Sequence, residues 1–384
     1  MRALFEVCRA VLIFPAKDLV MVEPAALATL EDSPRMKTNT VRSHDNASVH
    51  DERGEAARSR FIKLSLASLR FGPGLILVIL VLTLGLCSQY FFTARNLGNV
   101  LAQTAAIAVL AMGQHLVILT RGIDLSVGSV LALSSVVGAL VYRQVHSGTL
   151  IIAVMIGTGL AVGFVNGFVY VWGRLPHPFI ITLATLSIAR GLALELAGGA
   201  AIPGMPDIIL FLGGGSIGGV PASALAACAV ALALAGMTRW LVWGRWIYSV
   251  GGNPDAARRT GIPTKGVLLS VYMISGAAAG IGAVLTSGRT AAGSPLFGNL
   301  AELDSIAAVI IGGASFLGGR GHIGHALIGA LMIGIIRNAL NLLNVDIFFQ
   351  LIVIGVIIVL AVEADVLRGR LEARFRVLQS LGVK

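Results

Sequence analysis

The sequence predicts an all-α polytopic membrane protein with about ten transmembrane helices. Of the 384 residues, 56% are hydrophobic and only 12% are charged, with a mean hydropathy of +0.86, whereas a soluble domain carries roughly 25% charged residues. The apolar runs are continuous, and do not alternate over about 10 residues as the strands of a membrane barrel do. The 47 glycines suit helices that pack closely in lipid. This composition excludes an ordinary soluble enzyme.

The composition divides the chain into three parts. Residues 1–70 are polar, with mixed charge, and predict a disordered cytoplasmic extension. A translation start at Met36 is a hypothesis that would remove residues 1–35 from the protein. Residues 71–363 form the predicted transmembrane domain, and residues 364–384 form a basic cytoplasmic tail.

Ten apolar stretches are long enough to cross about 30 Å of hydrocarbon. The two shortest, Ala301–Leu317 and Asp346–Val362, could also be re-entrant. In chain order the ten are Gly74–Phe92, Leu97–Thr120, Ser126–Gln144, Leu150–Trp172, Pro178–Gly198, Ala222–Trp243, Thr264–Ser287, Ala301–Leu317, His322–Leu343 and Asp346–Val362.

An even number of spans places both termini on the same side of the membrane. If that side is the cytoplasm, thirteen Lys and Arg residues of the flanking segments lie inside and only Arg95, Arg143 and Arg289 lie outside. Because cytoplasmic loops of membrane proteins carry an excess of Lys and Arg, both termini are predicted to be cytoplasmic.

Small residues recur at helical spacing in two spans. Gly159, Gly163 and Gly167 line one face of the fourth span, and Gly276 and Gly280 do the same in the seventh. Small residues allow helix backbones to approach closely in lipid. Helix packing within the chain is the favoured interpretation, and a dimer seam is the alternative.

Two segments outside the spans are long. Residues 199–221, on the outside, are rich in Gly and Pro, and the stretch GGGSIG at 213–218 within them is expected to form a flexible connection. Residues 244–263, on the inside, are polar and basic. Within them Asn253 is a good helix N-cap, Pro254 suits the first helical position, and Gly261 would end the helix. A short capped helix is therefore predicted on the cytoplasmic face, where it would expose Arg258 and Arg259 to lipid headgroups or an acidic partner.

Four stretches carry a resemblance to a known family. They are Asp255-Ala256-Ala257 with Gly261, LVILTRGIDLSVGSVLAL at 116–133, the glycine-rich segment 302–334, and NALNLLNV at 338–345. Residues 61–362 resemble the membrane permease of bacterial ATP-binding-cassette (ABC) importers, in the ribose/monosaccharide branch. The family has Glu where this chain has Asp255.

The resemblance implies a type II ABC-importer-like helical bundle in the cytoplasmic (inner) membrane, acting as one half of a homodimer. It implies a periplasmic or lipid-anchored sugar-binding protein outside and a separate ATPase subunit inside, which binds ATP and magnesium. The chain has no GxxxxGK[ST] phosphate loop, and no cofactor, metal or nucleic-acid partner of its own is predicted. The implied ATPase-coupling loop comprises Asn253, Asp255, Ala256, Ala257, Arg258, Arg259 and Gly261, and the family-motif turn comprises Gly122, Asp124, Ser126 and Gly128.

Polar residues inside spans are costly in lipid and are functional candidates by default. Asn338 and Asn341 lie three apart on one helical face, and Asn344 extends this polar stripe by a further turn. Gln103 and Asn166 are weaker candidates. Amides both donate and accept hydrogen bonds, which suits sugar hydroxyls, so these residues are candidates for a translocation pathway. The alternative is that such amides bridge neighbouring helices.

Three further predictions concern charged residues in or near the spans. Arg121 and Asp124 are expected to form a local ion pair, with Asp124 capping the next span. Arg190 and Glu195 are possible partners within the fifth span. Arg337 departs from the family pattern; it is expected to snorkel, to pair within the bundle, or to indicate a less typical substrate.

The predicted function is transport of a monosaccharide, either a ribose-like sugar or a related polyol. Nucleosides or branched-chain amino acids are alternative substrates for the same architecture. An ion-coupled secondary transporter should show paired acids within its spans, which are nearly absent here. An intramembrane hydrolase would need a motif such as HExxH, which the sequence lacks.

Overall fold

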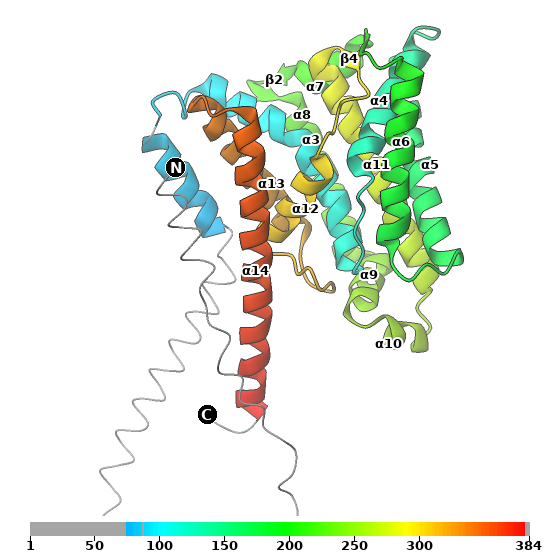
Figure 1. Cartoon of the computed structure of the whole chain (residues 1–384), viewed down its shortest axis with the longest axis vertical. Coiled ribbons are helices and arrows are strands. Elements are labelled where there is room, and N and C mark those ends of the chain that lie inside the picture. The colour runs from blue at the N-terminus through cyan, green and yellow to red at the C-terminus, as the bar shows by residue number, and fades with distance from the viewer. Residues whose placement is uncertain (1–73, 87, 381–384) are drawn as a thin grey trace, which may run out of the picture. The chain divides into compact units, whose positions relative to one another are not determined.

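The computed structural model describes residues 74–86 and 88–380 (Figure 1). The predictions for residues 1–70, including a start at Met36, lie outside the described residues. An apolar helix over Gly74–Leu86 comes first. The elements that follow are α3 (Ala94–Leu119), α4 (Val127–Tyr142), α5 (Gly148–Trp172), α6 (Pro178–Ala197), β1 (Ile202–Pro203), α7 (Asp207–Gly214), β2 (Ser216–Ile217), β3 (Val220–Pro221), α8 (Ala222–Trp240), α9 (Val242–Gly252), α10 (Pro254–Arg259), α11 (Thr264–Thr290), β4 (Ala292–Gly293), α12 (Ala301–Ile311), α13 (Ile323–Leu342) and α14 (Ile347–Ser380).

Six of the described helices are long and apolar enough to cross a membrane: α3, α5, α6, α8, α11 and α13. The described part of the chain is therefore a helical, multi-pass membrane protein, but the prediction of ten spans is not confirmed. Three further apolar helices, Gly74–Leu86, α4 and the Phe348–Glu363 part of α14, are shorter. The predicted boundary at residue 363 is not a helix end, because α14 continues to Ser380.

The predicted span Ala301–Leu317 is much shorter than expected. Helix α12 has 11 residues, or about 16 Å at 1.5 Å per residue, and stops at Ile311. Gly312 follows, where a Cβ atom would overlap the carbonyl oxygen of His325, and then Gly313, with a φ of 97°. A left-handed glycine cannot continue a helix, so residues 312–321 run as an irregular segment to α13.

Residues 120–126, between α3 and α4, are also irregular but are largely buried. Asp124 contacts Ser275, which lies near the middle of α11, so this segment reaches deep into the bundle. Non-helical backbone is tolerated at membrane depth only where protein covers it. Helix α4 follows at Val127, one residue after the predicted start, and has 16 residues.

Helices α5 and α11 pack with their backbones in contact, as the glycine spacing predicts. A Cβ atom on Gly159 would overlap the carbonyl oxygen of Gly276, and one on Gly163 would overlap that of Tyr272. On the partner helix, a Cβ atom on Gly280 would lie 2.6 Å from the Ile156 Cα. These glycines therefore serve packing within the chain.

Residues 199–221 have regular structure, so the expectation of a flexible connection at 213–218 is wrong. The segment contains β1, which pairs antiparallel with β4, then α7, and then the β2–β3 hairpin. Helix α7 packs on the end of α11, where a Cβ atom on Gly213 would lie 2.5 Å from the Leu285 carbonyl oxygen. The glycines permit close approach and tight turns, so they order the segment.

Buried positions concentrate on α3, α4 and α11, whereas most residues of α5, α6 and α8 are not buried and many of their large apolar side chains are exposed. This is the pattern expected for a bundle whose outer helices face lipid. Figure 1 shows α9 and α10 at one end of the bundle and α7, β2 and β4 at the other. These are called the α10 end and the β4 end below.

Candidate functional site

The short helix predicted at the cytoplasmic face is present as α10. The Asn253 side chain accepts a hydrogen bond from the Ala256 amide at 3.0 Å, as an N-cap does. Ala257 is buried, whereas Asp255, Ala256, Arg258 and Arg259 are exposed. Gly261, with a φ of 84°, ends the helix. The helix thus presents one acidic and two basic side chains at the α10 end.

Helix α9 precedes α10 and was not predicted. The predicted span to Trp243 ends at Trp240, and the chain turns into α9 after Leu241. Ile247 and Val250 are fully buried, and the Trp243 indole donates to the Ser270 hydroxyl of α11 at 2.7 Å. The spacing of Trp243, Ile247 and Val250 is the i, i+4, i+7 pattern of an amphipathic helix, a signal that could have identified it.

Arg121 joins this end of the bundle to α9. Its Nε donates to the Gly251 carbonyl at 2.7 Å, and its Nη2 donates to the Gly252 carbonyl. These are the last two residues of α9, where a cation also favours the helix dipole. The Gly319 amide donates to the Leu119 carbonyl at 2.9 Å, which brings the segment 312–321 to the same place. The predicted Arg121–Asp124 ion pair is therefore wrong, because Arg121 points to α9.

Asp124 is the centre of a buried polar network. Its Oδ1 accepts from the Ser126 amide at 3.0 Å and from the Ser126 hydroxyl at 2.6 Å, and its Oδ2 accepts from the Ser275 hydroxyl at 2.9 Å. The Gln114 amide pairs with the Asp124 backbone when its oxygen and nitrogen are exchanged to satisfy both groups. Asp124 thus caps the irregular segment, while α4 itself begins at Val127 without a side-chain cap.

The network continues through Asn166 to a third helix. The Asn166 Nδ2 donates to the Ser126 hydroxyl at 2.9 Å, and its Oδ1 accepts from the Thr185 hydroxyl of α6 at 2.6 Å. Both polar ends of this amide are occupied within the protein. Its geometry matches the alternative interpretation, that a buried amide bridges helices.

The two glycines of the motif turn are sites of close approach. A Cβ atom on Gly122 would lie 2.5 Å from the Tyr272 hydroxyl oxygen. A Cβ atom on Gly128 would overlap the Gly298 carbonyl oxygen and a carboxylate oxygen of Glu302. The turn containing Gly122, Asp124, Ser126 and Gly128 is therefore a junction between α3, α4, α11 and the start of α12.

The amides near the end of α13 also have partners. Asn338 and Asn96 of α3 exchange two hydrogen bonds, at 2.8 and 3.1 Å. The Asn341 Oδ1 accepts from the Gln350 amide of α14 at 2.8 Å. Asn344 follows α13 with a left-handed φ of 53°. The three residues do not line one polar stripe, and the first two connect α13 to its neighbours.

A cavity of about 550 Å³ lies between α3, α4, α11 and the start of α12, and is called the α3–α11 cavity. Its polar lining comes from Gln103, Thr286, Arg289, Thr290 and Asp304, and the rest is mainly apolar. Because Arg289 and Thr290 end α11, the cavity lies toward the β4 end. Of the predicted pathway residues, only Gln103 lines it.

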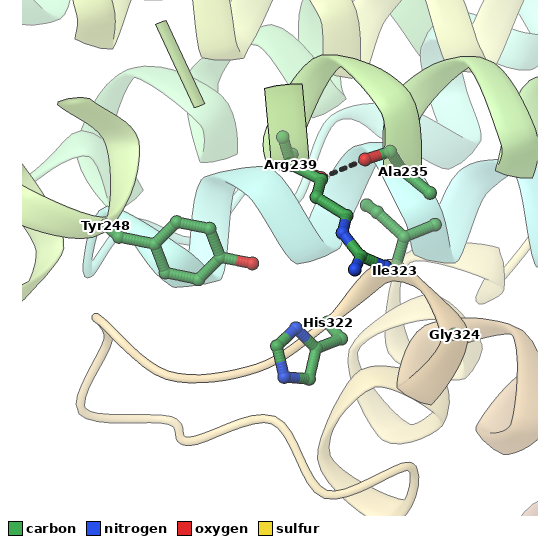
Figure 2. Close-up of a pocket in the computed structure, with 7 residues that line it drawn as sticks. Ala235, Arg239, Tyr248, His322, Ile323 and Gly324 are labelled. Carbon is green, nitrogen blue, oxygen red and sulfur yellow. Dashed lines mark hydrogen bonds between the residues drawn. The ribbon is translucent and has the colours of Figure 1, made fainter. Parts of the chain in front are cut away.

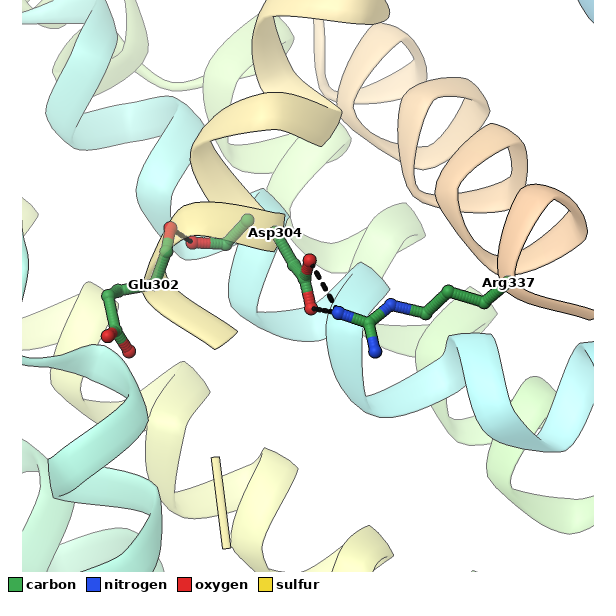
Figure 3. A network of polar contacts seen from close by, with 4 residues as sticks. Glu302, Asp304 and Arg337 are labelled. Carbon is green, nitrogen blue, oxygen red and sulfur yellow. Dashed lines mark hydrogen bonds and ion pairs between the residues drawn. The ribbon is translucent and has the colours of Figure 1, made fainter. Parts of the chain in front are cut away.

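Arg337 forms an ion pair within the bundle, which confirms one of the expectations for this residue. Its Nη2 donates to both carboxylate oxygens of Asp304, at 2.6 and 2.8 Å (Figure 3). The pair places a salt bridge at the wall of the α3–α11 cavity. Glu302 points away from this pair in Figure 3. The predicted Arg190–Glu195 pair is wrong, because Arg190 donates to the carbonyls of Pro295 and Phe297, the latter at 2.9 Å.

The side chains of the cavity and of α10 are suited to binding a solute or a partner protein. Among the described residues, no group of three or more His, Cys, Asp or Glu side chains could hold a metal ion. The cavity offers an amide, two hydroxyls and a guanidinium for hydrogen bonds to a small polar solute. The α10 end offers a short charged helix fixed to the bundle core.

Comparison with known proteins assigns the family. Residues 96–362 match the family model described as branched-chain amino acid transport system / permease component. No solved structure gives a significant match.

Curated relatives cover most of the chain. The D-allose transport system permease protein AlsC of Escherichia coli K12 is 39% identical over 82% of this chain and 96% of its own length. The ribose import permease protein RbsC of Bacillus subtilis is 40% identical over 77% of this chain and 92% of its own. The fructose import permease protein FrcC of Rhizobium meliloti is 34% identical over 76% and 84%. The chain therefore belongs to the family of permease components of ABC importers.

Proposed function

We propose that this chain is the permease subunit of an ABC importer that moves a monosaccharide across the cytoplasmic membrane. The match of residues 96–362 to the permease family carries the proposal, and the relatives named for allose, ribose and fructose import favour a sugar over a branched-chain amino acid or a nucleoside. The chain supplies the passage and is not an enzyme. ATP and magnesium are bound by a separate ATPase subunit.

In this function α10 is the ATPase-coupling helix. Its exposed Asp255, Arg258 and Arg259 are available to a docked ATPase subunit. Force applied to α10 passes directly to α9, and from Gly251 and Gly252 to Arg121 at the end of α3. From there the motif turn connects to α11, α5 and α6 through the network of Asp124. The contacts thus form a continuous physical connection from the docking helix to the core of the bundle.

The α3–α11 cavity is the part of this chain best suited to the sugar. Gln103, Thr286 and Thr290 offer neutral donors and acceptors to hydroxyl groups, and apolar residues surround them. Its volume of about 550 Å³ lies in the range of small-molecule sites, about 300–1,000 Å³. The amides of Asn166, Asn338 and Asn341 are hydrogen-bonded to other protein groups in this structure. They remain candidates for the pathway only if these hydrogen bonds break during transport.

The excess of Lys and Arg in the segments on that side supports a cytoplasmic location for the α10 end and for both termini. A periplasmic or lipid-anchored sugar-binding protein would then dock at the β4 end. A second copy of the chain would complete the passage as a homodimer, with membrane lipid around both.

The test uses the full chain reconstituted with its ATPase subunit and binding protein in proteoliposomes. Ala257→Glu, at a side chain that is only 4% exposed, and Gly261→Asp are expected to abolish sugar uptake and ATPase stimulation. A substrate panel of ribose, allose, fructose and leucine identifies the class of solute. Retained uptake in both variants would contradict the role of α10, and uptake of leucine alone would contradict the sugar.

A matched control separates the coupling role from backbone strain. Gly218 lies in the β2–β3 hairpin with a φ of 58°, and Gly261 has a φ of 84°. A Cβ atom at either position would meet open space. Gly218→Asp therefore adds the same charge and the same strain at the β4 end. It is expected to leave association with the ATPase subunit unchanged.

A further inference from the structure

A second cavity, of about 460 Å³, opens between the end of α8, α9 and the start of α13, and is called the α8–α13 cavity. Thr238, Arg239, Tyr248, His322 and Gly324 line it. Figure 2 shows the Arg239 guanidinium, the Tyr248 hydroxyl and the His322 ring arranged around one space. The cavity lies at the α10 end and is separate from both the α3–α11 cavity and α10.

The lining of this cavity is suited to an anion. The Arg239 guanidinium and the His322 ring have no hydrogen-bond or ion-pair partner among the described residues. The first amides of α13, those of Ile323 and Gly324, have no acceptor within the helix and stand at its positive end. No carboxylate lines the cavity. The Tyr248 hydroxyl donates to the Gly321 carbonyl at 2.8 Å, which holds the cavity wall to α9.

The helix that carries Arg239 has an apolar outer face. Leu225, Leu232 and Arg239 are spaced by seven residues and lie on one face of α8. Leu232 is 75% exposed, and Trp240, at the helix end, is 77% exposed. Leu232 lies about 10 Å from Arg239 along the helix axis, within one leaflet of about 15 Å. Exposed tryptophan is typical of the level of the headgroups.

We propose that the α8–α13 cavity binds the phosphate headgroup of an anionic phospholipid from the leaflet at the α10 end. The acyl chains lie along the Leu225–Leu232 face of α8, and the headgroup meets Arg239, His322 and the start of α13. Basic pockets between membrane helices bind such headgroups in this way. The bound lipid holds the ends of α8 and α13 together beside α9. The proposal requires that the chain lies in a membrane, and it is independent of the transported solute.

The test counts lipids on the purified full chain by native mass spectrometry, after extraction into detergent with equal amounts of phosphatidylglycerol and phosphatidylcholine. The unaltered chain is expected to retain phosphatidylglycerol preferentially, and Arg239→Gln to reduce its retention at least tenfold. Arg239→Lys, which keeps the charge, is expected to restore much of it. Arg245→Gln is the matched control, because Arg245 is an exposed arginine on α9 that does not line the cavity.

The remaining outcomes overturn the proposal. Equal retention of the two lipids, or equal loss in Arg239→Gln and Arg245→Gln, shows that the cavity selects no anionic lipid. Displacement of phosphatidylglycerol by millimolar inorganic phosphate, with equal thermal stabilisation by phosphate alone, assigns the site to a free anion. Weaker association with the ATPase subunit in Arg239→Gln, with lipid retention unchanged, assigns the surface to protein docking.

Discussion

Replacing Arg121 by glutamine tests the connection between α9 and the core. The variant removes the Nε bond to Gly251, which is partly buried, and the Nη2 bond to Gly252, which is exposed. A hydrogen bond from a charged donor contributes about 1.5 kcal/mol where it is partly buried and well under 1 kcal/mol where water competes. We therefore expect about 1.5–2 kcal/mol less stabilisation of the docked position of α9 and α10, or about 10–30-fold in an equilibrium constant.

The assay measures the affinity of the ATPase subunit for the chain in nanodiscs, and the sugar transported per ATP hydrolysed. Arg121→Gln is expected to weaken the affinity or to lower the transport ratio by about tenfold. Arg174→Gln is the matched control: Arg174 is an exposed arginine that follows α5 at the same end, also has a positive φ, and has no hydrogen-bond partner among the described residues. Equal effects in the two variants, or none in Arg121→Gln, would refute the role given to Arg121.

Three further variants test the packing and the polar networks. Gly159→Leu is expected to prevent the chain from folding stably, because its side chain would overlap the α11 backbone. Gly157→Leu, on the same helix but beside open space, should be tolerated. The yield of monodisperse protein measures both effects. Asn338→Leu leaves the Asn96 amide without its buried hydrogen-bond partner and should lower thermal stability by about 1–3 kcal/mol. The double variant with Asn96→Leu should recover part of this loss. Additive effects of the two substitutions would show that the two amides are not coupled. Asp124→Asn replaces one of the two carboxylate oxygens that accept the hydrogen bonds of Ser126 and Ser275 by an NH2 donor, and removes the charge. It should destabilise the chain by about 1–3 kcal/mol in thermal melts, so an unchanged melting temperature would count against the network.

The features that the sequence predicts well are those fixed by near neighbours in the chain. Asn253, Pro254 and Gly261 specify the start and end of α10 through local hydrogen bonds and backbone preference, and the structure has that helix. The glycine spacing in α5 and α11 likewise predicts close packing. A helix face without Cβ atoms allows another backbone to approach closely, whichever part of the chain supplies that backbone.

The features that the sequence does not predict depend on distant partners. Arg121 lies three residues from Asp124, and proximity favours an ion pair, but the acceptors it uses are 130 and 131 residues away. The early end of α12 has a visible signal in Gly312 and Gly313, yet the hydropathy of the following residues hides it. The partners of Asn166 and Asn338 also come from other helices, and no spacing within one chain segment identifies them.

The backbone contact between α5 and α11 limits how the protein can move. With no side chains between them at Gly159 and Gly276, the two helices have no layer that could deform to let one slide along the other. We therefore expect a transport cycle to carry α5 and α11 as a single rigid body. Any opening and closing then occurs between this pair and the helices packed against it, such as α3 and α4, and cross-links placed between α5 and α11 should leave the cycle running.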